Sequence, residues 1–186
     1  HHFYWFFISN ELVINILMTK LKFFKFQKKE AYLYFLFYLS LLGGFLFGEN
    51  STGGAIIDYV GQKSVSIDFS KNFKNTFLNF DQYATRHSPV LMILLSGFEK
   101  LNLSDYVIRL IHLHLCLSLP LIFYYCLKEK YNFLSKEILI VLVGLIFISP
   151  TFRSLSIWPD SRVLGLVFFC LSIYFYIKFD NTKQFK

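Results

Sequence analysis

Long apolar runs separated by short basic segments are the main pattern of this chain. The first uncharged run extends from Ala31 to Gly48, and it follows a group of lysines between Lys20 and Lys29. A helix rises about 1.5 Å per residue, so this run reaches about 27 Å, close to the hydrocarbon thickness of a bilayer. Together with three later runs, the pattern predicts four membrane spans, at about residues 31–48, 106–127, 137–157 and 163–177.

The basic segments predict how these spans are oriented. Lysines gather before the first span, between the second and third spans, and after the fourth span. Cytoplasmic flanks carry the Lys/Arg excess, so all three segments are expected on the cytoplasmic side. We therefore expect a cytoplasmic basic segment at residues 1–30, a membrane domain at residues 31–178 and a cytoplasmic tail at residues 179–186, which we expect to be truncated. Residues 49–105 then form a large outside loop.

Aromatic residues recur at helical spacing inside the outside loop, at Phe69, Phe73, Phe77, Phe80 and Tyr83. This spacing predicts one helix with its rings on one face and with lysine and asparagine on the other. Such a helix is typical of the membrane interface, and a packed helix within a folded loop is the alternative. The apolar stretch Val90–Leu95 is too short to span, so we expect it to re-enter the membrane or line its surface.

The predicted fold class is therefore all-α: a polytopic membrane helix bundle with about four spans and an outside loop that contains interfacial helices. The composition agrees, because 55% of the residues are hydrophobic, above the usual 45–50% of soluble chains. The net charge of +7 comes from residues that flank the apolar runs. We therefore predict membrane lipids as partners and no nucleic acid.

Two carboxylates stand where the chain leaves the first span. Asp58, in the sequence STGGAIIDYVG, is the stronger candidate, and Glu49 is the alternative. A carboxylate in this place can take a proton from an acceptor hydroxyl or hold a divalent cation. A solvated loop aspartate is the simpler interpretation. If the chain holds a metal, Asp58 is the ligand we predict.

Basic residues gather at two further places on the predicted outer side. Arg86 and His87 precede Ser88-Pro89, which favours an extended or turn conformation, and a fixed basic pair suits phosphate oxygens. The segment SPTFRSLSIWPDSR carries Arg153, Asp160 and Arg162 before the fourth span. We interpret it as a site for a lipid phosphate oriented by Asp160. Interfacial anchoring and an ion-pair network that stabilises a turn are the respective alternatives.

These elements, in this order, resemble the N-terminal part of a GT-C superfamily glycosyltransferase of the protein mannosyltransferase and aminoarabinose transferase kind. Asp58 stands at that family's acidic position. His87-Ser88-Pro89-Val90 stands at its Lys-Pro-Pro-Leu position, and Ser149-Pro150 with Trp158-Pro159-Asp160 follows its Ser-Pro…Arg-Pro-Asp pattern. The chain departs from the family at His87, where a lysine is usual, and at Trp158, where an arginine is common.

The resemblance implies transfer of a sugar from a polyprenyl-phosphate donor to a lipid or protein acceptor on the outer face of the membrane. Asp58 would be the general base, and Arg86, His87, Arg153 or Arg162 would neutralise the departing phosphate. A divalent cation is a possible cofactor. The resemblance also implies a multi-pass protein of the bacterial inner membrane with a cytoplasmic N-terminus.

A non-enzymatic polytopic protein, such as a transporter subunit, is the alternative function. In that case Arg109 and the histidines of the second span would line a pathway. Transporters concentrate function within the spans, whereas this chain has a long outside loop, which favours the enzyme.

Overall fold

The computed structural model describes residues 28–183, and side chains from residue 31 to residue 180. The chain divides into two compact units, residues 1–36 and residues 37–186. Of the first unit, only the beginning of one helix is described, so most of the predicted basic segment 1–30 lies outside the described residues.

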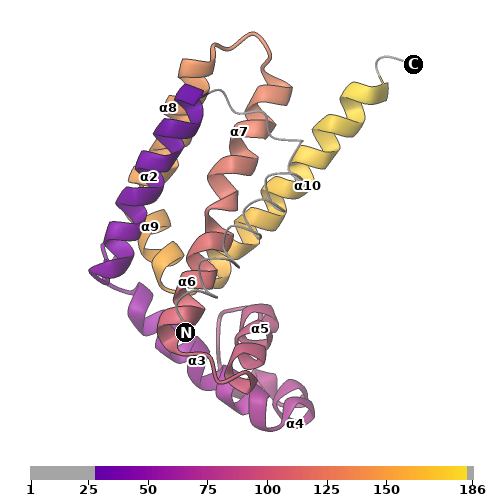
Figure 1. Cartoon of the computed structure of the whole chain (residues 1–186). Helices are drawn as coiled ribbons and strands as arrows, with labels where there is room; N and C mark the ends of the chain where they lie inside the picture. The colour runs from indigo at the N-terminus through magenta and orange to yellow at the C-terminus, as the bar shows by residue number, and fades with distance from the viewer. Residues whose placement is uncertain (1–27, 184–186) are drawn as a thin grey trace, which may run out of the picture. The chain divides into compact units, whose positions relative to one another are not determined.

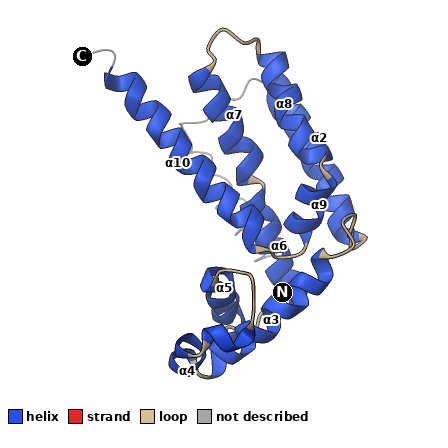
Figure 2. Ribbon diagram, turned by 180° about the vertical axis from the view of Figure 1, so that it is seen from behind, coloured by secondary structure: helices blue, strands red, loops and turns tan. Residues whose placement is uncertain are grey.

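Every regular element in the described part of the chain is helical, and no strand occurs there (Figure 2). The all-α prediction is therefore confirmed for these residues. In chain order the helices are α2 (Lys28–Leu46), α3 (Ala55–Lys71), α4 (Phe73–Leu78), η1 (Phe80–Tyr83), α5 (Pro89–Lys100), α6 (Asp105–Cys116), α7 (Ser118–Lys130), α8 (Lys136–Ile148), α9 (Pro150–Ile157) and α10 (Ser161–Lys183).

Two helical stretches of the described chain are long and apolar enough to cross a membrane. One is Asp105–Lys130, which combines α6 and α7, and the other is Ser161–Asp180 in α10. They correspond to the second and fourth predicted spans. A third span is present if α8 and α9 are counted together. The first predicted span corresponds to a shorter apolar helix, Ala31–Leu46, so the four-span count is not reached on length and composition.

The third predicted span, residues 137–157, is not one straight helix. It bends by 62° between α8 and α9. The cause is local, because Pro150 is the first residue of α9. A proline has no backbone N–H to donate and its ring clashes with the preceding turn, so α8 cannot continue through it. The Ser149 hydroxyl then caps α9 by accepting a hydrogen bond from the Phe152 backbone N–H.

The aromatic segment 69–83 also differs from its prediction as a single helix. It is divided among the end of α3, the short α4 and the turn η1. Asn72 interrupts the helix because its side chain accepts a hydrogen bond from the Asn75 N–H and starts α4 anew. The rings nevertheless stay together, since Phe69 packs against both Phe73 and Phe80.

The predicted outside loop, residues 49–105, is folded, and its core reaches the predicted spans. Helix α3 packs along α5, with Val65, Phe69 and Met92 buried between them. A second buried cluster joins this pair to α6 and α10; its members are Tyr59, Leu91, Leu95, Ile108 and Leu164. The predicted short stretch Val90–Leu95 is thus part of the helix α5. This packing brings α3 to the start of α10 (Figure 1).

Candidate functional site

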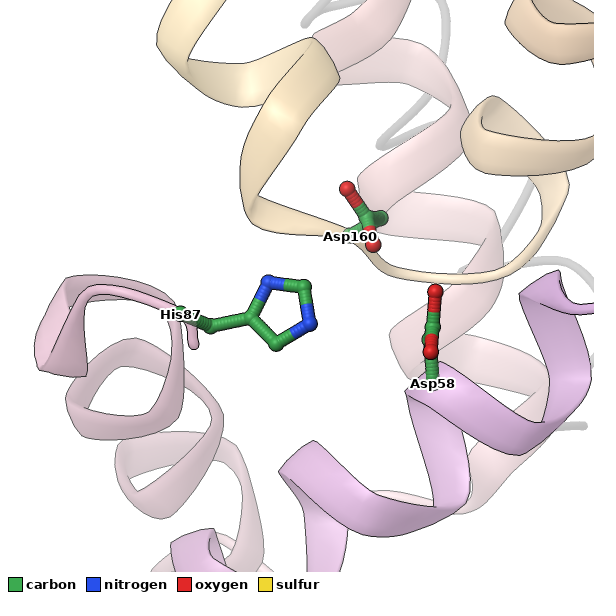
Figure 3. Close-up of side chains that lie close together, drawn as sticks. All are labelled: Asp58, His87 and Asp160. Carbon is green, nitrogen blue, oxygen red and sulfur yellow. The ribbon is translucent and has the colours of Figure 1, made fainter. Parts of the chain in front are cut away.

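Three side chains far apart in sequence converge where α3, the loop before α5 and the turn before α10 meet (Figure 3). They are Asp58, His87 and Asp160, and one ligand atom of each lies within 4.8 Å of the other two. All three were predicted as site residues from sequence.

Arg162, also predicted, links the two carboxylates of this cluster. Its guanidinium NH2 group lies 2.5 Å from Asp58 Oδ2 and 2.9 Å from Asp160 Oδ2. Its Nε donates a second hydrogen bond, 2.9 Å long, to Asp160 Oδ1. Arg162 therefore makes a bidentate contact with Asp160 and a single contact with Asp58.

Asp160 is fully buried and also begins α10. Its Oδ1 accepts a hydrogen bond from the backbone N–H of Arg162, so Asp160 acts as the N-cap of this helix. Burial by itself raises the pKa of a carboxyl group, but the hydrogen bonds and charge of Arg162 outweigh it and hold the pKa of Asp160 below its ordinary value. Asp160 thus stays ionised and fixes Arg162 in place.

His87 reaches the cluster because the chain is extended before α5. Ser88 caps that helix through the Val90 N–H, and Pro89 occupies its first turn. The His87 ring nitrogen Nδ1 lies 3.1 Å from the hydroxyl oxygen of Ser161, the first residue of α10. The sequence pattern did not single out Ser161.

The turn that carries Asp160 is braced by Trp158 and Arg109. The Arg109 guanidinium lies 3.5 Å from the centre of the Trp158 ring, and its Nε donates a hydrogen bond to the Ile157 carbonyl. Within α6, the buried His112 ring contacts the Leu155 carbonyl oxygen at 3.0 Å. These two basic residues of the second predicted span therefore bind α9 and its following turn.

Glu49 and Arg153, two further predicted site residues, pair with each other. Arg153 donates hydrogen bonds to both Glu49 oxygens, at 2.8 Å from Nε and 2.6 Å from NH2. The hydrogen bond from Arg153 holds the pKa of Glu49 below its ordinary value. Arg153 also donates to the Ser40 backbone carbonyl. This pair ties α2 to α9, and neither side chain lies in the Asp58 cluster.

Within the described part of the chain, three cavities are lined by Asp58 or Arg162. The largest, the apolar cavity, has a volume of about 640 Å³ and lies among side chains of α7, α8, α9 and α10, including Val163 and Leu166. The junction cavity, of about 240 Å³, is lined by Thr52, Asp58 and Thr151, among others. Arg162 lines both of these cavities.

The third, the polar cavity, has a volume of about 390 Å³ and lies on the other side of Asp58. Its lining includes Asp58, Arg86 and His87. Asp58 therefore stands between the polar cavity and the junction cavity, and Arg162 stands between the junction cavity and the apolar cavity. Arg86, which was predicted to bind the lipid phosphate as Arg162 was, lines a different cavity from Arg162.

By residue type, Asp58, His87 and Asp160 suit a divalent cation such as zinc or manganese. However, the Arg162 guanidinium already contacts an oxygen of each carboxylate and supplies positive charge between them. A cation would have to displace this contact.

Gln62 is the buried polar residue that sequence reasoning missed. It stands on α3 one helical turn after Asp58, is 2% exposed, and lines the polar cavity. Its Nε2 lies 3.5 Å from Asp160 Oδ2. Gln62 lies four residues after Asp58, a spacing that puts both side chains on one face of a helix. No helix was predicted for this segment from the sequence, so the spacing was not recognised.

Searches for related proteins found no matching family model, no matching curated protein and no matching solved structure.

Proposed function

We propose that this chain is a membrane glycosyltransferase that transfers a sugar from a polyprenyl-phosphate-linked donor to an acceptor on the outer face of the membrane. The proposal combines the resemblance to GT-C enzymes with the geometry around Asp58. Two or three apolar helices that could cross a membrane support a membrane location.

The observation that carries the proposal is the position of Asp58 and Arg162 between apolar and polar cavities. Arg162 lies where the apolar cavity meets the junction cavity, and its guanidinium contacts Asp58. A lipid phosphate has an apolar tail and an anionic head. This arrangement offers an apolar space for the tail, a guanidinium for the phosphate and a carboxylate beside it.

In the proposed reaction, an acceptor hydroxyl attacks the anomeric carbon of the donor sugar. Asp58 takes the hydroxyl proton, a new carbon–oxygen bond forms, and the bond between the sugar and the phosphate oxygen breaks. The lipid phosphate leaves with the bonding electrons, and Arg162 neutralises its charge. Asp160 holds Arg162 in place for this step.

The contacts that residues of the second predicted span make with other elements favour the glycosyltransferase over the transporter alternative. Arg109 and His112 are engaged with α9 and the turn that follows it. Residues that line a transport pathway would instead face a polar cavity.

The test is transfer of a labelled sugar from a polyprenyl-phosphate donor by the full chain in lipid nanodiscs. We expect Asp58→Asn to lower the rate by about 10²–10⁴-fold, the usual contribution of a general base. Asparagine keeps the size of the side chain and can still contact Arg162. Undiminished transfer by this variant would overturn the assignment of Asp58.

Asp81→Asn is the matched control. Asp81 is an exposed carboxylate of the same loop, in η1, outside all three cavities. The rate of sugar transfer by the Asp81→Asn variant should equal that of the unsubstituted chain. A loss as large as that of Asp58→Asn would mean that the assay reports loop charge or folding.

A further inference from the structure

Apart from Asp58, the polar cavity is lined by hydrogen-bonding groups that the proposed donor site does not use. Its polar side chains include Asp58, Gln62, Ser64, Thr85, Arg86 and His87. Its volume of about 390 Å³ falls within the roughly 300–1,000 Å³ of small-molecule sites. Its lining shares no residue with that of the apolar cavity, whereas Asp58 lines both the polar cavity and the junction cavity.

Gln62 is the first observation that points to a ligand in this cavity. Its side chain is 98% buried, and no described residue donates a hydrogen bond to its Oε1. Nε2 faces the Asp160 carboxylate, an acceptor, so Oε1 is the atom left to accept a hydrogen bond. A buried acceptor without a donor is destabilising, because it has lost its water and gained no partner. A ligand hydroxyl would satisfy it.

Arg86 is the second observation. It is exposed on the cavity wall, and within the described part of the chain it has no ion-pair or hydrogen-bond partner. The guanidinium groups of Arg153 and Arg162, by contrast, are engaged with carboxylates. An anionic group on a ligand would supply the missing partner of Arg86.

We propose that the polar cavity binds the acceptor, and that this acceptor is an anionic saccharide. One hydroxyl donates to Gln62 Oε1, the anionic group meets Arg86, and a second hydroxyl faces the carboxylate of Asp58. Naming this ligand the acceptor rests on the proposed function, whereas its chemical class rests on Gln62 and Arg86. The donor phosphate, in this arrangement, is bound by Arg162 and not by Arg86.

Two matched sugars test the chemical class: methyl glucuronide, which is anionic, and methyl glucoside, which is neutral. Their affinities are measured by ligand-observed NMR on the full chain in nanodiscs, without donor or turnover. A charge-assisted hydrogen bond of about 1.5 kcal/mol corresponds to roughly tenfold. We therefore expect the glucuronide to bind about tenfold more tightly.

Arg86→Gln should abolish this preference and leave glucoside binding unchanged. Lys74→Gln, which removes an exposed charge on α4 away from the polar cavity, should retain it. Gln62→Met should weaken both sugars by about tenfold, the loss expected from one buried hydrogen bond. Because Gln62 is buried, the thermal unfolding of the Gln62→Met variant is measured in parallel. If that variant does not fold, the Arg86→Gln variant alone tests the chemical class of the ligand.

Three results would overturn the inference. They are equal affinity of the unsubstituted chain for both sugars, a glucuronide preference that survives Arg86→Gln, and an Arg86→Gln variant that loses affinity for polyprenyl phosphate while keeping it for the glucuronide. The binding assay is independent of sugar transfer. A chain that binds the glucuronide but transfers no sugar would refute the proposed function and leave the saccharide site standing.

Discussion

Single residues at the site act mainly through the partner that each one holds. One terminal nitrogen of Arg162 contacts both Asp58 and Asp160, and its Nε donates a further hydrogen bond to Asp160. Arg153 has the same chemistry but is engaged with Glu49. The two arginines therefore have different roles, although both were equally good phosphate ligands by sequence.

Gly44 gives a prediction at this scale. A Cβ at this position would overlap with the Glu49 carboxylate and lie 2.9 Å from Arg153 NH2, so Gly44→Ala must displace the ion pair. We expect a loss of about 1.5–3 kcal/mol in the free energy of unfolding, the contribution of hydrogen bonds to charged groups. Chemical unfolding in detergent micelles measures it.

The neighbouring Gly43 is the control. A Cβ at Gly43 meets nothing within 4 Å, so Gly43→Ala should be neutral or up to about 1 kcal/mol more stable, because alanine favours a helix. Equal destabilisation by the two substitutions would show that the ion pair is not the reason for glycine at position 44.

At the scale of elements, capping residues divide what periodicity alone joins. The aromatic spacing of residues 69–83 is regular, yet Asn72 begins a new helix there. Pro150 likewise separates α9 from α8. The side chains on either side still share a core, as the contacts of Phe69 with Phe73 and Phe80 show.

This packing predicts different outcomes for two phenylalanines of the aromatic segment. Phe69 is fully buried between α3 and α5, so Phe69→Ala should cost about 3–5 kcal/mol. Phe77 is 52% exposed, so Phe77→Ala should change stability by less than about 1 kcal/mol. Hydrogen exchange of α3 and α5 measures both variants. Equal protection losses would mean that the segment is not packed as described.

At the scale of the whole molecule, one buried cluster ties the predicted outside loop to the predicted spans. Its residues come from α3, α5, α6 and α10, and it holds the start of α3 beside the start of α10. The loop is therefore a folded part of the same unit. The side of the membrane on which this loop lies decides whether a donor displayed on the outer face can enter the cavities.

The predicted orientation is tested with single cysteines and a membrane-impermeant thiol reagent. Val60 is 60% exposed on α3, and Asn132 is exposed between α7 and α8. We expect Val60→Cys to be labelled in intact cells and Asn132→Cys only after lysis, because basic flanks stay cytoplasmic. The unsubstituted chain, whose three cysteines are buried or half-buried, gives the background. The reverse labelling would contradict the orientation.

What could be read directly from the sequence depends on local chemistry. The length of the apolar runs located two helical stretches, the one formed by α6 and α7 and the one formed by α10. A helix long enough to cross a membrane needs such an apolar segment. Residue type and position also identified Asp58, His87, Asp160 and Arg162 as candidates. These properties need only neighbouring residues and elementary chemistry.

Tertiary structure decided which of the candidates meet. Asp58 and Arg162 are 104 positions apart, and so are Glu49 and Arg153. No local period specifies which arginine joins which carboxylate, because that choice follows from how α3, α5 and α10 bury their apolar faces together. The same packing buries Gln62 and places Arg86 and Arg162 in the linings of different cavities, and both features become visible only in the folded structure.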